Sequence, residues 1–151
     1  MDKTIEEKPL QLHKEGFNCA ESVLKTVTGV WGYHNSLIPR IATPFGGGIG
    51  RRGLLCGALT GGLMAIGSRF GRDKGGEPRD KAYGPAAEFV KRFEEEFGSL
   101  NCYDLIECDL NTPEGRMRQR AIRQEKCAIV HCECREDDLG AVRVGALEID
   151  V

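Results

Sequence analysis

Cysteines are the residues in this chain most able to do chemistry. The 151 residues include seven of them, an odd number. A cysteine thiolate binds soft metal ions and attacks sulfur, and a chain without an export signal keeps its thiols reduced. Seven cysteines in such a chain therefore point to metal binding or redox chemistry before structural disulfides.

Three cysteines fall at predicted helix starts. Asn18 and Glu21 have the spacing of a capping box, so Cys19 begins a helix. Asn101 suits the N-cap position before Cys102, and Cys56 lies two residues into a helix that follows a glycine-rich loop. The exposed amides and the positive end of the helix dipole stabilise a thiolate at such positions.

The setting of Cys127 is different. It falls inside a predicted helix and shares a face with Arg123 and His131, four residues away on either side. A single buried cysteine is more often a small apolar side chain than a ligand. We interpret these cysteines as a site because three of them recur at helix starts. Arg51 and Arg52 add positive charge near Cys56.

The other three cysteines have a weaker case. On one helix, Cys108 would point about 120 degrees away from Cys102, so we expect it to be structural. Cys132 and Cys134 form a Cys-x-Cys pair that could hold a soft metal or a disulfide, although no second pair at zinc-finger spacing accompanies it. His13 and His34 are isolated and more typical of surface or hydrogen-bonding residues.

The elements that would position these residues are helices. Hydrophobic periodicity, caps and glycines predict a single domain over 1–151, an all-α bundle of about five or six helices. A loop rich in glycine and proline occupies 36–53, and the tail 138–151 fits either a helix or a strand. The predicted helices cover 4–15, 18–32, 54–70, 86–97, 102–109 and 112–132.

Glycines shape two of these segments. Small residues on adjoining faces of the 54–70 helix indicate close backbone packing, and they also leave room for a homodimer. Residues 48–53 match G-x-G-x-x-G, but the two prolines before them argue against the strand that a dinucleotide fingerprint needs. We interpret this loop as a tight turn that delivers Cys56 to a site.

Composition limits the partners. The net charge of -2 gives no general attraction to nucleic acid. Glu114 and Glu125 flank the arginines 116, 118, 120 and 123, and we interpret this stretch as a solvated helix face. The first residues do not resemble a secretory signal, and no apolar run reaches transmembrane length. We expect a cytoplasmic protein that neither inserts into a membrane nor binds nucleic acid.

Taken together, these segments resemble a known family. Residues 18–23 (NCAESV), 45–50 (FGGGIG) and 56–61 (CGALTG), followed by Cys102 and Cys127, are similar to the C_GCAxxG_C_C family of redox-active proteins. The resemblance covers about residues 10–131. It implies a four-cysteine site formed by Cys19, Cys56, Cys102 and Cys127.

The resemblance also implies a cofactor. A related domain accompanies an iron-sulfur centre in split-Soret cytochromes, which implies a [2Fe-2S] cluster here, for which four thiolates are the usual ligands. The chain has no Cys-x-x-Cys-His, so c-type haem is not expected. The leading hypothesis is an electron-transfer or redox-sensing protein with an unidentified redox partner. The alternatives are a metal-free thiol-disulfide oxidoreductase or sensor and a zinc-stabilised structural or adaptor domain.

Overall fold

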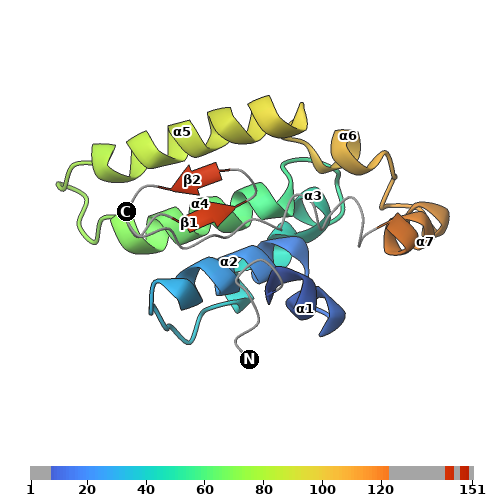
Figure 1. Ribbon diagram of the computed structural model, residues 1–151, viewed down its shortest axis with the longest axis horizontal. Coiled ribbons are helices and arrows are strands. Elements are labelled where there is room, and N and C mark those ends of the chain that lie inside the picture. Colours follow the sequence, from blue (N-terminus) through green and yellow to red (C-terminus); the bar gives the residue numbers. More distant parts are fainter. Residues whose placement is uncertain (1–7, 123–141, 145–146, 150–151) are drawn as a thin grey trace.

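The computed structural model describes residues 8–122, 142–144 and 147–149. In these residues the fold is all-α, with one short hairpin. Figure 1 shows the arrangement of its elements. In chain order they are α1 (Lys8–Lys14), α2 (Cys19–Val30), the 3-10 helix η2 (Arg40–Phe45), α3 (Gly46–Ile49), α4 (Gly57–Phe70), α5 (Asp80–Phe97), α6 (Cys102–Ile106), α7 (Pro113–Ile122), β1 (Val142–Val144) and β2 (Leu147–Ile149).

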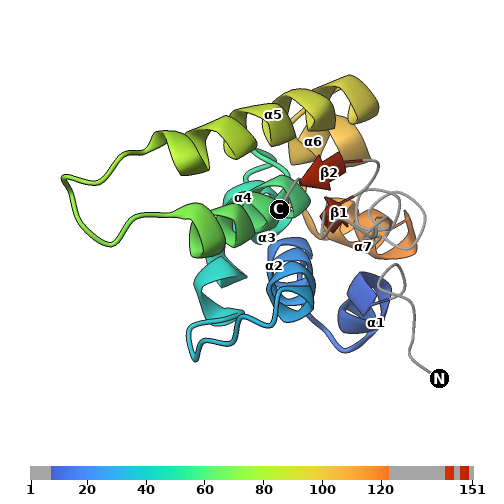
Figure 2. The same cartoon turned by 60° about the vertical axis from the view of Figure 1, so that its left-hand side comes forward.

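Helix α4 forms the centre of the bundle. It packs against α2 on one side and α5 on the other, and Figure 2 shows it between them. The buried core lies along these two contacts. Its largest fully buried side chains include Leu24, Leu59, Ile66, Phe89 and Phe93.

The glycines of α4 allow this close approach. A methyl group added at Gly61 would lie 2.5 Å from the carbonyl oxygen of Ala20, and one at Gly62 would lie 2.5 Å from the ring of Phe89. The predicted close packing of the 54–70 helix is therefore confirmed. Since these small residues face α2 and α5 of the same chain, they offer no support for the homodimer, which stays a prediction.

Helix α2 begins as predicted. The Asn18 side chain accepts a hydrogen bond from the Glu21 amide at 3.0 Å, and the Glu21 carboxylate accepts one from the Asn18 amide at 2.8 Å. This reciprocal pair is a complete capping box. It satisfies donors that the first turn would otherwise leave exposed, and it fixes Cys19 as the first residue of the helix.

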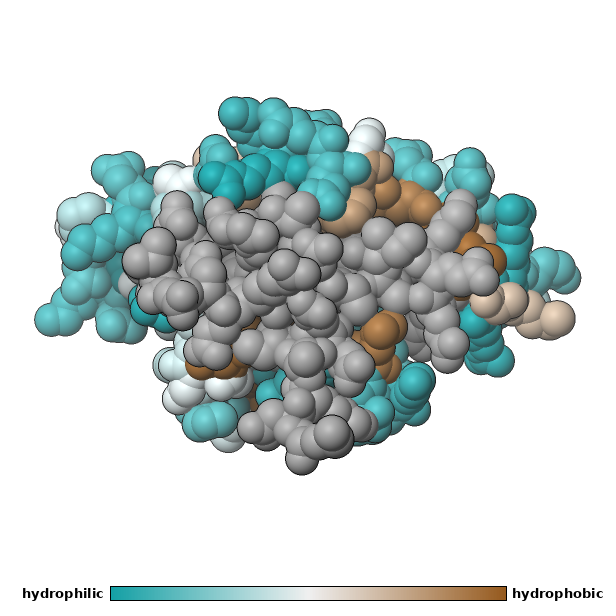
Figure 3. Space-filling model, viewed as in Figure 1, coloured by the Kyte–Doolittle hydropathy of each residue, from teal (hydrophilic) through white to brown (hydrophobic). Residues whose placement is uncertain are grey.

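Helix α5 is amphipathic but longer than expected. It begins at Asp80 rather than near residue 86, so Pro85 lies inside it. Proline lacks a backbone donor, so it is tolerated near the start of a helix but usually marks a break in the interior. For this reason the sequence did not reveal the first turn of α5. Phe89 and Phe93 face the core. The outer face is polar, as the hydrophilic side chains along the upper edge of Figure 3 show.

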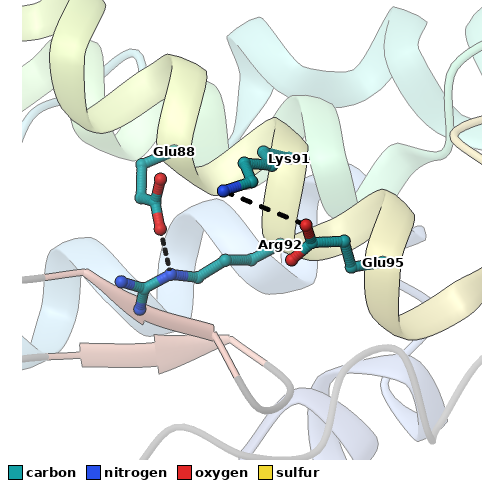
Figure 4. Close-up of polar contacts among 4 residues, drawn as sticks. All are labelled: Glu88, Lys91, Arg92 and Glu95. Atoms are coloured by element: carbon teal, nitrogen blue, oxygen red, sulfur yellow. Dashed lines mark hydrogen bonds and ion pairs between the residues drawn. The ribbon is translucent and has the colours of Figure 1, made fainter.

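Two ion pairs run along the outer face of α5. Arg92 Nε donates to a Glu88 carboxylate oxygen at 2.6 Å, and Lys91 Nζ lies 4.0 Å from Glu95 (Figure 4). Both pairs join residues four apart, which are neighbours on a helix surface. Because they are solvent-exposed, they contribute little to stability.

Other boundaries also differ from the prediction. Helix α6 ends at Ile106 rather than near 109, because Glu107 adopts a left-handed conformation with φ of 51°. The tail, for which helix and strand were both open, forms β1 and β2, paired antiparallel with Val142 opposite Ile149. Of the described helices, none is both long and apolar enough to cross a membrane.

Candidate cysteine site

An antiparallel bridge brings together two cysteines that are 46 residues apart. Leu55 pairs with Asn101, and two backbone hydrogen bonds flank this pair. The Cys56 amide donates to the Leu100 carbonyl at 2.8 Å, and the Cys102 amide donates to the Leu54 carbonyl at 2.7 Å. In this register Cys56 and Cys102 are diagonal neighbours on the same face, which in a regular ladder lie roughly 7–8 Å apart.

Cys19 joins them from helix α2. A methyl group added at Gly57 would lie 2.9 Å from Cys19 Cβ and 3.0 Å from the Ala20 amide nitrogen. The residue after Cys56 is therefore in close contact with Cys19. Cys19 also packs against a small buried cluster made of Cys102, Ile106, Cys108 and Leu110.

The glycine-rich loop packs against Cys102 and against the backbone of the bridge. Gly48 has φ of +68°, and a methyl group there would lie 2.7 Å from Cys102 Cβ and equally close to the Leu54 backbone. The Leu54 amide donates to the Gly48 carbonyl at 3.0 Å. Only glycine fits this left-handed position against a neighbouring chain segment. The loop thus positions both Cys102 and the bridge that carries Cys56.

The loop does not belong to a dinucleotide fold. The segment before it is the 3-10 helix η2 rather than a strand, so the βαβ context of the fingerprint is missing. Gly46 instead lies against Asn18, since a methyl group there would be 2.6 Å from the amide nitrogen of that side chain. The same loop therefore connects to the start of α2 as well as to the bridge.

All three cysteines lie at helix starts, but α4 begins at Gly57 rather than at Leu54, so Cys56 precedes the helix instead of lying two residues inside it. Cys19 is the first residue of α2, Cys56 is the N-cap of α4, and Cys102 is the first residue of α6. The helix dipole should stabilise a thiolate most at the starts of α2 and α4, because α6 has only five residues. Cys56 and Cys102 are buried, with 8% and 7% of their surface exposed, whereas Cys19 is half-buried.

Cys108 lies close to Cys102. The prediction of a structural role assumed that both cysteines were on one helix and pointed in different directions. Cys108 lies beyond the end of α6, so the helical angle to Cys102 does not apply. It is 3% exposed, belongs to the same cluster as Cys102, and its thiol donates to the Ile106 carbonyl at 3.1 Å. The left-handed Glu107 redirects the chain, and no local sequence signal announced that turn.

Three other cysteines and two histidines were also considered in the sequence. Cys127, Cys132 and Cys134 are outside the described residues, as is the expected continuation of α7 toward 132. His13 is half-buried and its Nδ1 lies 2.9 Å from the Phe17 carbonyl oxygen, which fits the expected hydrogen-bonding role. His34 is exposed. Within residues 8–122, no group of three or more His, Cys, Asp or Glu side chains is arranged to hold a metal ion.

A groove of about 470 Å³ opens beside Cys19. Its walls come from the start of α2, the η2–α3 segment, Leu110 and α7. Sequence reasoning did not find it, because α7 and the glycine loop are distant along the chain. The described lining residues are Asn18, Cys19, Thr43, Pro44, Gly46, Gly47, Gly50, Arg51, Leu110, Arg116, Gln119 and Arg120.

Fold and site together define a small helical protein with cysteines gathered from separate helix starts. The family model described as "Putative redox-active protein (C_GCAxxG_C_C)" matches residues 17–136, and the chain belongs to this family. No curated protein and no solved structure matches the chain. The resemblance seen in the cysteine and glycine motifs is thereby confirmed.

Proposed function

We propose that this protein transfers electrons or senses redox state through Cys19, Cys56, Cys102 and Cys127. The proposal is supported by the packing of Cys19 against the cluster that contains Cys102, and by the bridge that joins the segments of Cys56 and Cys102. A purely apolar role would not require three cysteines, separated by up to 83 residues, at neighbouring helix starts. Membership of a redox-active family supports the same conclusion.

The cofactor that suits this donor set is an iron-sulfur cluster. Thiolates are its usual ligands, and a cluster supplies one-electron chemistry. Cys56 and Cys102 would contribute buried ligands and Cys19 a half-buried one. Cys127 is five residues beyond the end of α7, so the chain can carry it at most about 18 Å from Ile122, which packs against the cysteine cluster. These residues fit the cluster in type, and a [2Fe-2S] form remains our proposal.

Metal analysis after anaerobic purification tests this function. We expect about two iron and two sulfide per chain, with visible absorption. Cys56→Ser should remove both, because it deletes a buried ligand. Cys108→Ser is the matched control, since Cys108 is also buried but is not among the four. Iron-free, colourless protein after cluster reconstitution would contradict the proposal, as would stoichiometric zinc whose chelation unfolds the chain.

A metal-free thiol-disulfide function is the second candidate. Cys56 and Cys102 favour it because they are diagonal neighbours on one face of the bridge. A Cα separation above about 7 Å is too long for a disulfide, so bond formation would require the bridge to shift. In this case two thiols lose two electrons and two protons to an oxidant as one S–S bond forms. Counting thiols before and after mild oxidation of the metal-free protein separates the two functions, because this one predicts loss of a single specific pair.

The remaining expectations belong to the same proposal. Thiols that must stay reduced suit the cytoplasm, which is where we place the protein. Its redox partner is unidentified, and we propose neither a nucleic acid nor a membrane as a partner. The sequence lacks the haem attachment motif, so c-type haem is not part of the proposal.

A further inference from the structure

The groove beside Cys19 has a basic lining. Three of its residues are arginines, Arg51 from the glycine loop and Arg116 and Arg120 from α7. No aspartate or glutamate is among the lining residues that the structure describes. The three arginines come from two separate parts of the chain, so their convergence is a property of the fold rather than of one basic helix.

These arginines have no carboxylate partner within residues 8–122, where the ion pairs found are those of α5. The acidic residue Glu21 contacts two of the lining residues, Asn18 and Thr43. Its two oxygens accept hydrogen bonds from the Asn18 amide at 2.8 Å and from the Thr43 hydroxyl at 2.5 Å. Glu21 is thus committed to the capping box and to Thr43 rather than to an arginine.

One arginine of the lining is held in place by a hydrogen bond within the protein. Arg116 donates to the Leu110 carbonyl at 3.0 Å, which fixes its guanidinium group at the groove wall. That group has five N–H donors, so one bond to a carbonyl leaves donors for another acceptor. A pre-positioned donor lowers the entropic cost of binding. Arg51 and Arg120 are exposed and can adjust to a bound molecule.

The size and chemistry of the groove indicate its ligand. A volume of about 470 Å³ is within the range of small-molecule sites. Guanidinium groups match the oxygens of carboxylates and phosphates with two parallel hydrogen bonds. We propose that this groove binds a small molecule carrying two or more carboxylate or phosphate groups, and that it holds this molecule against Cys19.

The inference does not depend on the cluster. It concerns arginines rather than cysteines, and binding can be measured whether or not metal is present. Its failure would leave the metal analysis unaffected, and a failure of the metal analysis would leave the arginine-lined groove in place. The two proposals can therefore be overturned separately.

Calorimetric titration of the purified full chain at low ionic strength tests the inference. The probes are inorganic pyrophosphate and citrate, which separate phosphate from carboxylate chemistry. We expect single-site binding of at least one probe. In Arg51→Gln/Arg120→Gln the affinity should fall by about tenfold or more, because hydrogen bonds to charged groups are lost.

The chain offers a matched control. Arg52→Gln/Arg118→Gln removes the same charge from the same two segments at exposed residues that do not line the groove. Its affinity should stay within about twofold of wild type, as expected for distant surface charges. If the first double variant does not fold, Arg120→Gln against Arg118→Gln repeats the comparison on exposed positions of α7 alone.

Each outcome decides the inference. Binding of pyrophosphate alone assigns a phosphate-bearing ligand, binding of citrate alone assigns a carboxylate-bearing one, and binding of both supports a general oxyanion site. Absence of binding by both probes overturns the proposal. Equal losses in the two double variants also overturn it, because they would show a diffuse charge effect.

Discussion

Gly57 and Cys19 are in such close contact that the site depends on the missing side chain of the glycine. A methyl group at Gly57 would lie 2.9 Å from Cys19 Cβ, closer than real Cβ atoms approach. Gly57 follows Cys56, so this contact sets how α4 approaches the start of α2. The stability of the bundle and the geometry of the site therefore share one packing contact.

Substitution of Gly57 by alanine tests this dependence. We expect Gly57→Ala to lower the free energy of unfolding by about 1–3 kcal/mol, because the added methyl group overpacks a contact with backbone. Denaturant unfolding measures the change. Gly67→Ala is the control in the same helix, since a methyl group there meets nothing within 4 Å. It should stabilise by about 0.5–1 kcal/mol, and equal effects of the two variants would contradict the packing argument.

The cap of α2 gives a second prediction. Asn18→Ala removes the acceptor for the Glu21 amide and the bond from the Asn18 side chain to the Thr43 carbonyl at 3.0 Å. We expect a loss of about 1–2 kcal/mol in unfolding free energy. Asn18→Asp keeps the capping oxygen and loses only the bond to Thr43, so its thermal stability should fall between wild type and Asn18→Ala. A neutral Asn18→Ala would show that the cap does not stabilise the helix.

The cysteines should differ in reactivity in reduced, chelator-treated protein. Alkylation followed by mass spectrometry should label Cys19 before Cys56, Cys102 and Cys108, because Cys19 is half-buried in the groove and the others are buried. Buried thiols react only when the surrounding structure opens. In denaturant these four rates should converge. Early labelling of Cys108 in the native protein would contradict its burial at 3% exposure.

The ion pair of α5 predicts a weak dependence of stability on pH. The hydrogen bond from Arg92 is the main cause that lowers the pKa of Glu88 below its usual 4.5, opposed by desolvation and aided by the charges of Arg92 and Lys91. A carboxyl whose pKa is lower in the folded state stabilises above its unfolded pKa. That contribution is lost as the pH falls through the folded value.

Thermal melts of wild type and Glu88→Gln at several pH values test the direction of this pH dependence. The wild type should be slightly more stable at neutral pH, and the difference should shrink as the pH falls below about 4.5. Glu94→Gln is the control at another exposed position of α5, because Glu94 forms no ion pair in the described part of the chain. A difference that grows in acid would contradict the prediction.

Local features of the fold could be predicted from the sequence. The cap at Asn18 and the phenylalanines of α5 depend on residues within two turns of each other, so their spacing is visible in the chain. The close packing of α4 was also predictable, since adjoining glycines in a helix lower its stability unless another backbone is near. The helix-start settings of Cys19, Cys56 and Cys102 followed from the same local signals.

Non-local features could not be predicted in this way. The pairing of Leu55 with Asn101 joins segments 46 residues apart, and neither segment is long enough to show strand alternation. The position of Cys108 depends on the left-handed turn at Glu107, a residue type with no special preference for that conformation. The arginines of α7 were interpreted as a solvated face because their meeting with Arg51 depends on tertiary packing.

The bridge between Leu55 and Asn101 has a consequence for how the two buried thiols become accessible. Cys56 and Cys102 each hold one of the hydrogen bonds that flank it, so separation of this short contact would release both residues at once. We therefore expect the two thiols to be exposed to oxidants as a pair, at a rate set by one local opening event. One short backbone contact would then control both how well the two thiols are protected and how readily oxidants reach them.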